Sequence, residues 1–152
     1  MEFKKMNKNL ILKITLSCLL IIFAVSLRLI PHPANFAPIA ALAFFGGVYL
    51  GRTYAFALPI TAMLISDFFI GFYSPAVMTF VYGSFLLIGL VALWLKRNKK
   101  WYWILTATTS GSILFYLATN WAVWAFGSLY PHTLSGLFES YLLALPFFRG
   151  TL

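Results

Sequence analysis

Residues 64–72 read LISDFFIGF, an apolar stretch that contains a single acid, Asp67. What this acid does in such surroundings is the first question that the sequence raises. Between Glu2 and Glu139 the sequence contains no acid other than Asp67. An ionised carboxylate in a helix that lies within a bilayer costs about 2.5–3.5 kcal/mol. Asp67 therefore needs partners, and the surrounding sequence indicates where they lie.

The composition is that of a membrane protein. The chain has 152 residues, of which 62% are hydrophobic, 19% aromatic and 9% charged, whereas a soluble domain carries roughly 25% charged residues. Apolar runs of about 18 residues or more recur along the chain, and each is long enough to cross a ~30 Å hydrocarbon core. The sequence predicts an all-α fold, a polytopic helical membrane protein in which residues 1–152 form one integral membrane domain, a compact bundle of about five to six transmembrane helices.

Proline, glycine and basic turns divide the chain into segments. The expected helices cover residues 9–30, 36–50, 54–72, 76–95 and 101–126, followed by a shorter apolar segment at 134–148. The sequence PHP at 31–33 ends the first helix, and YSP at 73–75 ends the third. The second segment is short for a crossing and rich in Ala and Gly, so we expect it to be tilted or to lie in locally thinned bilayer.

The net charge of +8 is concentrated at the ends of apolar segments. One basic cluster is Lys4, Lys5, Lys8 and Lys13, and the other is Lys96, Arg97, Lys99 and Lys100. Four crossings between the clusters place both on one side, together with Arg52, as the positive-inside rule requires. We therefore predict a multi-pass protein with a cytoplasmic N-terminus. This distribution differs from the basic face of a nucleic-acid-binding protein, so no nucleic-acid partner is expected.

The sequence offers no set of catalytic residues. The single cysteine, Cys18, excludes an internal disulfide and a metal site built on several thiolates. There is no His/Glu spacing typical of a metal site, no nucleophile elbow and no glycine-rich phosphate loop between a strand and a helix. His32 and His132 lie in proline-containing turns, where a solvated histidine is the usual case. We expect no enzyme activity, no cofactor and no metal.

Other polar residues lie at a depth similar to that of Asp67. Arg28 is near the outer end of the first expected helix, and Tyr82 is near the outer end of the fourth. In the fifth, polar and aromatic residues recur every four positions and cover one broad face, namely Thr108, Ser112, Tyr116, Asn120 and Trp124. An Arg28–Asp67 ion pair that only holds helices together is one interpretation. A ligand pocket open to the outer side is the other, and one pair of residues can serve both.

Small residues in the second segment predict close helix packing. Ala37 and Ala41 form a small-xxx-small pair, which lets another helix approach closely. The partner helix is either internal or part of a separate subunit, and internal packing is the simpler interpretation.

The order of motifs resembles a family of small, uncharacterised bacterial inner-membrane proteins. The motifs are RLIPHPANFAPIAALAFFGGVYLG, LISDFFIGF, FVYGSF, TNWAVWAFGSLYPHTLSGL and ALPFFRGTL, which together cover residues 28–152. More distantly, the layout resembles the substrate-binding S components of energy-coupling-factor vitamin transporters. That resemblance implies a bundle of six helices in a bacterial inner membrane, a micronutrient bound near the outer face, a transmembrane coupling subunit with ATPases, and a further helix after Leu152. The S components carry their Ala-xxx-Ala docking motif on the first helix, whereas here the clear pair is Ala37 and Ala41.

These observations predict a membrane-embedded component that binds a small, vitamin-like micronutrient for uptake. The predicted substrate-binding residues are Arg28, Asp67, Tyr82, Tyr116, Asn120 and Trp124, with Tyr130 and His132 in a lid and Ala37 and Ala41 docking a partner subunit. The alternative is a non-transporting structural or accessory subunit of a membrane complex, in which the same residues only join helices. An ion pathway is disfavoured because only Thr108 and Ser112 continue the polar face inward.

Overall fold

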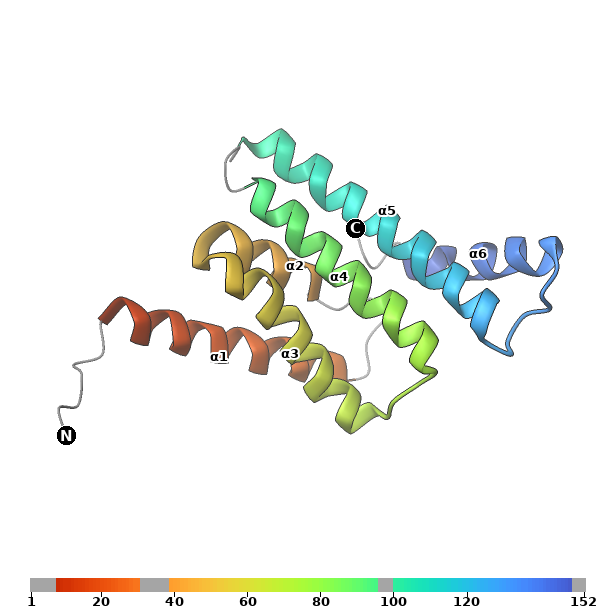
Figure 1. The fold of residues 1–152 in the computed structure, drawn as a ribbon, viewed down its shortest axis with the longest axis horizontal. Helices are drawn as coiled ribbons and strands as arrows, with labels where there is room; N and C mark the ends of the chain where they lie inside the picture. Colours follow the sequence, from red (N-terminus) through yellow and green to blue (C-terminus); the bar gives the residue numbers. More distant parts are fainter. Residues whose placement is uncertain (1–7, 31–38, 96–99, 149–152) are drawn as a thin grey trace.

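The computed structural model describes residues 8–30, 39–95 and 100–148, and in these ranges it is an all-α bundle without strands (Figure 1), as the sequence predicts. Its elements are α1 (Lys8–Leu29), α2 (Ile39–Phe45), the π-helix η1 (Gly46–Leu50), α3 (Arg52–Ile70), α4 (Pro75–Leu95), α5 (Trp101–Phe126) and α6 (Leu134–Phe148). The extents of α5 and α6 agree with the sequence-based expectation, and those of α1 and α4 agree within one residue.

Three helices have the length and composition to cross a membrane. They are α1, α3 and α4, with 22, 19 and 21 residues, which correspond to about 33, 29 and 32 Å of helix axis. α5 has 26 residues, but it is rich in Trp, Tyr, Thr and Ser and is not among these three helices. The described part of the second segment, α2 and η1, covers only about 18 Å. The crossings of α2–η1, α5 and α6 therefore remain predictions.

Large apolar side chains on the outer faces of the bundle support a membrane location. α1 is the clearest case, because Leu12, Leu19 and Phe23 are exposed along its length while only Ser17, Ala24 and Val25 are buried. On α3, Phe68 is among the most exposed large apolar side chains of the described residues. A contiguous apolar surface of this kind is stable against lipid but not against water.

Two contacts fix the directions of the first helices. Lys13, near the start of α1, donates through Nζ to the carbonyl oxygen of Leu50 at the end of η1, over 3.1 Å. Arg28, near the end of α1, contacts Asp67 near the end of α3. The helices α1 and α3 therefore run parallel, and α2–η1, which connects them in sequence, packs against α3 and α4 (Figure 1).

All described basic residues except Arg28 gather at one end of the bundle, which we call the basic end. α4 runs antiparallel to α3, since Tyr82 in its first half contacts Asp67. The C-terminus of α4 and the start of α5 therefore lie at the end where Lys13 and Arg52 lie, so Lys100 joins them there (Figure 1). This arrangement is the one that the charge pattern requires if four segments cross the bilayer.

The third helix begins and ends two residues earlier than the sequence analysis placed it. The prediction used YSP at 73–75 as the stop signal, but glycines on either side of the helix set its limits. Gly51 has φ 127° and Gly71 has φ 107°, values that L side chains rarely adopt. The N–H of Gly71 donates to the Asp67 carbonyl oxygen over 2.8 Å and ends the helix. Asp67 is consequently three residues from the end of α3.

Glycines let η1 pack tightly against its neighbours. A Cβ at Gly46 would collide with the Tyr54 carbonyl oxygen of α3, and one at Gly47 would lie 2.8 Å from the Ala92 Cβ of α4. Both glycines are buried. Gly46 and Gly47 thus serve internal packing of the second segment. Internal packing at Ala37 and Ala41 stays a prediction.

Candidate functional site

An ion pair joins α1 to α3 at the end opposite the basic end. Arg28 Nη1 lies 2.9 Å from Asp67 Oδ1, and the Tyr82 hydroxyl of α4 donates to Asp67 Oδ2 over 2.7 Å. The same Nη1 donates to Ser66 Oγ over 2.6 Å and lies 2.9 Å from Met63 Sδ. We call Arg28, Asp67 and Tyr82 the ion-pair cluster. It brings together three of the six predicted site residues, from three helices.

The local sequence explains why α3 can hold Arg28. Met63, Ser66 and Asp67 are spaced three and four positions apart, so their side chains share one face of the helix. Ser66 donates its own hydroxyl hydrogen to α3 carbonyl groups, of Ala62 at 2.7 Å or Met63 at 3.0 Å. Its oxygen lone pair is therefore free to accept a hydrogen bond from Arg28. The guanidinium group thus contacts three acceptor atoms on one face of α3, namely Met63 Sδ, Ser66 Oγ and Asp67 Oδ1.

Burying the charges of this cluster is costly unless each charge is paired and hydrogen-bonded. The Asp67 side chain is 1% exposed and that of Arg28 is 17% exposed. Both carboxylate oxygens accept a hydrogen bond, which is the condition for keeping an ion pair out of water. The Arg28 side chain is therefore only partly buried, whereas that of Asp67 is almost completely buried.

A second phenol lies beside the cluster. Tyr73 follows the end of α3, and its partial burial together with the negative charge of Asp67 raises the pKa of its hydroxyl to about 12. The positive charge of Arg28 opposes this shift but does not cancel it. Tyr73 therefore stays a neutral hydrogen-bond donor at physiological pH, and the sequence analysis did not include it in the site.

The other three predicted residues form a separate group on α5. Tyr116 donates its hydroxyl to the Tyr141 carbonyl oxygen of α6 over 2.5 Å, and the Trp124 Nε1–H donates to the Pro131 carbonyl oxygen over 3.1 Å. Asn120 Nδ2 donates to the carbonyl oxygen of Tyr116 in its own helix, over 2.8 Å. The bonds of Tyr116 and Trp124 attach α6 and its connection to α5, whereas the bonds of the ion-pair cluster join α1, α3 and α4.

The segment predicted to be a lid connects α5 to α6. His132 stacks edge-on with Trp124, at 6.1 Å between ring centroids, and its Nε2 lies 3.2 Å from the Gly127 carbonyl oxygen. Tyr130 is half-buried in the same connection. These contacts order the segment in the described state, and its action as a lid stays a prediction.

Of the two predicted docking residues, only Ala41 lies within the described ranges. Ala37 lies outside the described residues. Ala41 is exposed on α2 and lines a pocket of this chain. Docking of a partner subunit at this pair stays a prediction.

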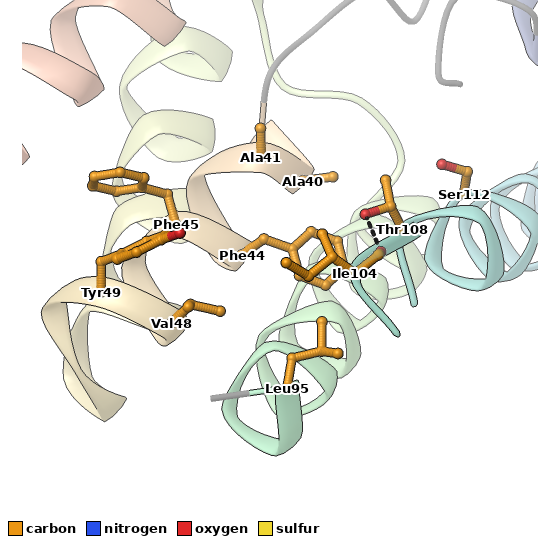
Figure 2. A pocket seen from close by; sticks show the side chains of 10 residues that line it. All are labelled: Ala40, Ala41, Phe44, Phe45, Val48, Tyr49, Leu95, Ile104, Thr108 and Ser112. Atoms are coloured by element: carbon orange, nitrogen blue, oxygen red, sulfur yellow. Dashed lines mark hydrogen bonds between the residues drawn. The ribbon is translucent and has the colours of Figure 1, made fainter. Parts of the chain in front are cut away.

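That pocket was missed by the sequence analysis. It has a volume of about 460 Å³ and lies between α2–η1 on one side and α5 on the other, with α4 beneath (Figure 2). We call it the apolar pocket; its lining includes Phe44, Val48, Tyr49, Leu95, Ile104 and Thr108. The one sequence signal for it was the inward continuation of the α5 polar face by Thr108 and Ser112. None of the predicted substrate-binding residues lines it.

Metal binding finds no support in the described ranges. Within 8–30, 39–95 and 100–148 there is no group of three or more His, Cys, Asp or Glu side chains arranged to hold an ion. Cys18 is an exposed free thiol on α1.

The fold and the apolar surfaces define a helical membrane protein. Within that class the chain belongs to DUF6580, a family of unknown function whose sequence pattern matches residues 8–152. No curated protein and no solved structure matches the chain. Membership of this family confirms the expectation of an uncharacterised family. The bacterial inner-membrane origin and the more distant resemblance to transporter S components stay predictions.

Proposed function

We propose that this protein is a membrane-embedded substrate-binding component for the uptake of a small, vitamin-like micronutrient. The proposed site is the ion-pair cluster and its surroundings, at the end of the bundle opposite the basic end. With the basic end in the cytoplasm of a bacterium, as the positive-inside rule predicts, this site faces outward across the inner membrane. Uptake then requires a partner that supplies energy, such as a transmembrane coupling subunit with ATPases.

The observation that supports this proposal best is the convergence of polar groups from three helices at one end of the bundle. Intramembrane ionisable residues mark substrate pathways more often than chance, because each one is expensive to keep. The partly exposed Arg28 side chain, with neutral phenols at Tyr82 and Tyr73 nearby, suits an anionic or flat heteroaromatic ligand. The Asp67 carboxylate suits a ligand that carries an amine group.

The three predicted residues on α5, Tyr116, Asn120 and Trp124, lie outside the ion-pair cluster, and we call them the α5 group. Tyr116 and Trp124 bind backbone carbonyl groups of α6 and of the connection before it. We propose that α6 and the connection containing Tyr130 and His132 move together, and that Asn120 meets the ligand when they do. Ala37 and Ala41 remain the proposed docking pair for the energising subunit.

One observation favours the alternative, a structural or accessory subunit. Both oxygens of Asp67 are already bonded by protein groups, Arg28 and Tyr82. A carboxylate satisfied in this way joins helices without any ligand. The two functions make different predictions for a variant that lacks the charges of both Arg28 and Asp67, because only the uptake function predicts the loss of a bound ligand.

The deciding experiment is native mass spectrometry of the protein purified gently from its own host. The test variant is the double change Arg28→Gln with Asp67→Asn, which removes both charges but keeps hydrogen-bonding groups. The control is Lys8→Gln, which removes one charge elsewhere on α1. The proposal predicts a stoichiometric vitamin-sized molecule on the wild-type and Lys8→Gln proteins that is absent from the folded double variant.

Other outcomes decide between the two functions. If the wild-type protein carries no small molecule, and no water-soluble vitamin in a panel raises its unfolding temperature, the uptake function is wrong. An empty protein that co-purifies with an unrelated membrane complex supports the accessory function. A co-purifying coupling subunit with ATPases identifies the energy source.

A further inference from the structure

The apolar pocket has features that the proposed uptake site does not explain. It lies in the half of the bundle that contains the basic end, away from the ion-pair cluster. One of its walls is η1, a π-helix, and the rare π-helical turns are frequently found at functional sites. Its volume of about 460 Å³ is in the range of small-molecule sites.

The walls of the pocket suit hydrocarbon. Phe44 and Val48 line one side and Ile104 lines the other (Figure 2). The Thr108 hydroxyl donates to the Ile104 carbonyl oxygen over 2.8 Å, so its hydrogen already has an acceptor within α5. A polar vitamin bound here would lose its hydrogen bonds to water and gain few in return, whereas an alkyl chain loses nothing.

The pocket opens to the surroundings of the bundle. Phe45 and Tyr49 on its α2–η1 side and Ile104 on its α5 side are all exposed. In a helix bundle within a membrane, such a lateral opening between helices faces acyl chains. The occupant therefore comes from the lipid phase.

The depth of the pocket matches one leaflet. Ile104, Thr108 and Ser112 follow Lys100 by four, eight and twelve residues, which places them about 6, 12 and 18 Å along the α5 axis from the basic end. One leaflet contributes about 15 Å of hydrocarbon, half of a ~30 Å core. The pocket thus spans the depth of a single acyl chain.

Cations lie where the head group of such a lipid is expected. Arg52 begins α3 just after η1, and Lys100 precedes α5, and both side chains are exposed. Lys13 reaches the same level, because its ammonium group bonds the Leu50 carbonyl oxygen. Basic groups at a membrane surface attract anionic lipid by about 1 kcal/mol each.

We infer that the apolar pocket binds one acyl chain of an anionic phospholipid, drawn from the leaflet at the basic end, with the head-group phosphate held by Arg52 and Lys100. This inference does not rest on the proposed ligand site, since Arg28, Asp67 and Tyr82 lie at the other end of the bundle. The two proposals share Ala41, which lines the pocket and belongs to the proposed docking pair. A lipid bound there fills the space between α2–η1 and α5, two elements that pack on α4 but leave a gap between them.

The test uses the full-length protein in micelles doped with phosphatidylglycerol and phosphatidylcholine of identical chains, and counts the retained lipids by native mass spectrometry. The wild-type protein is expected to retain one phosphatidylglycerol in preference to phosphatidylcholine. Thr108→Phe fills the pocket and lowers retention of both lipids about tenfold, equivalent to about 1.4 kcal/mol. Arg52→Gln and Lys100→Gln each lower phosphatidylglycerol retention about fivefold and leave phosphatidylcholine unchanged.

A matched control exists on the same helix. Thr106 is exposed, lies outside the pocket and, like Thr108, donates its hydroxyl to the carbonyl oxygen four residues earlier, over 2.8 Å. Thr106→Phe is therefore expected to retain lipid as the wild-type protein does. If Thr108→Phe does not fold, Ala41→Leu narrows the pocket from its α2 side, with the exposed Ala57→Leu on α3 as its control.

Two results overturn the inference. One is equal retention of both lipids by the wild-type protein, which indicates bulk lipid only. The other is unchanged retention by a folded pocket-filling variant. The double change at Arg28 and Asp67 should not alter lipid retention, so failure of the uptake function and failure of the lipid site are distinguished by separate measurements.

Discussion

At one end of the bundle the buried charge of Asp67 is held by Arg28 and Tyr82, whereas towards the other end Phe44, Val48 and Ile104 surround a pocket of about 460 Å³. The first region is polar, with both oxygens of Asp67 bonded by protein groups, and the second is lined mainly by apolar side chains. The physical reason is the solvent. Hydrocarbon cannot satisfy a polar group but readily fills an apolar gap, so the chain must complete the first region itself and can leave the second to lipid.

The largest expected effect comes from breaking the ion-pair cluster. Asp67→Ala leaves the largely buried Arg28 charge unpaired and removes the acceptor of the Tyr82 hydroxyl. We expect the free energy of unfolding to fall by about 3–5 kcal/mol, the usual result of removing one partner of a buried pair. Thermal unfolding in detergent micelles, followed by circular dichroism, measures this loss.

The double change Arg28→Gln with Asp67→Asn is the control for that prediction. It removes both charges and leaves amides that can hydrogen-bond, so its stability should lie within about 1.5 kcal/mol of wild type. Equal instability of the double variant and Asp67→Ala would show that shape rather than charge pairing holds α1 to α3.

A smaller effect is expected at the opposite region, where glycine allows close packing. Gly46→Ala places a Cβ against the Tyr54 carbonyl oxygen and 3.1 Å from Leu58 Cδ1. Backbone cannot move aside easily, so we expect a loss of about 1–3 kcal/mol, measured by the same thermal unfolding.

Gly83→Ala in α4 is the matched control for Gly46→Ala. A Cβ there has no described heavy atom within 4 Å, and replacing a helix-interior glycine by alanine gains about 0.5–1 kcal/mol. The two variants should therefore shift the unfolding temperature in opposite directions. A shift in the same direction contradicts the packing explanation.

The smallest effect tests the α5 group, which lies outside both regions. Tyr116→Phe removes the hydrogen bond to the Tyr141 carbonyl oxygen, and we expect a loss of about 0.5–1.5 kcal/mol confined to α6. Hydrogen exchange of the α6 amides should become faster, while that of α3 is unchanged. Tyr130→Phe in the α5–α6 connection is the control for loss of a phenol hydroxyl, and uniform acceleration in both helices would contradict a local role.

Much of the fold was predictable because helices in an apolar chain leave strong local signals. The bounds of α5 and α6 follow from apolar length and turn residues, and the basic residues indicate which segment ends lie together. The third helix shows the limit of such signals. YSP at 73–75 was an obvious stop, but Gly71 ends the helix first, since a glycine at positive φ ends a helix as firmly as a proline and is harder to recognise in sequence.

The sequence by itself determined that Asp67 needs a partner at its own depth, because an unpaired charge in an apolar helix is too costly to keep, and Arg28 was the evident cation. Only the tertiary structure decided that Tyr82 completes this cluster while Asn120 bonds its own helix, because pairing between helices depends on their rotation about their axes. The apolar pocket likewise depends on how far apart α2–η1 and α5 sit on α4. Gly47 lets η1 approach Ala92 of α4 closely, but the distance from α2–η1 to α5 has no local signature in the sequence.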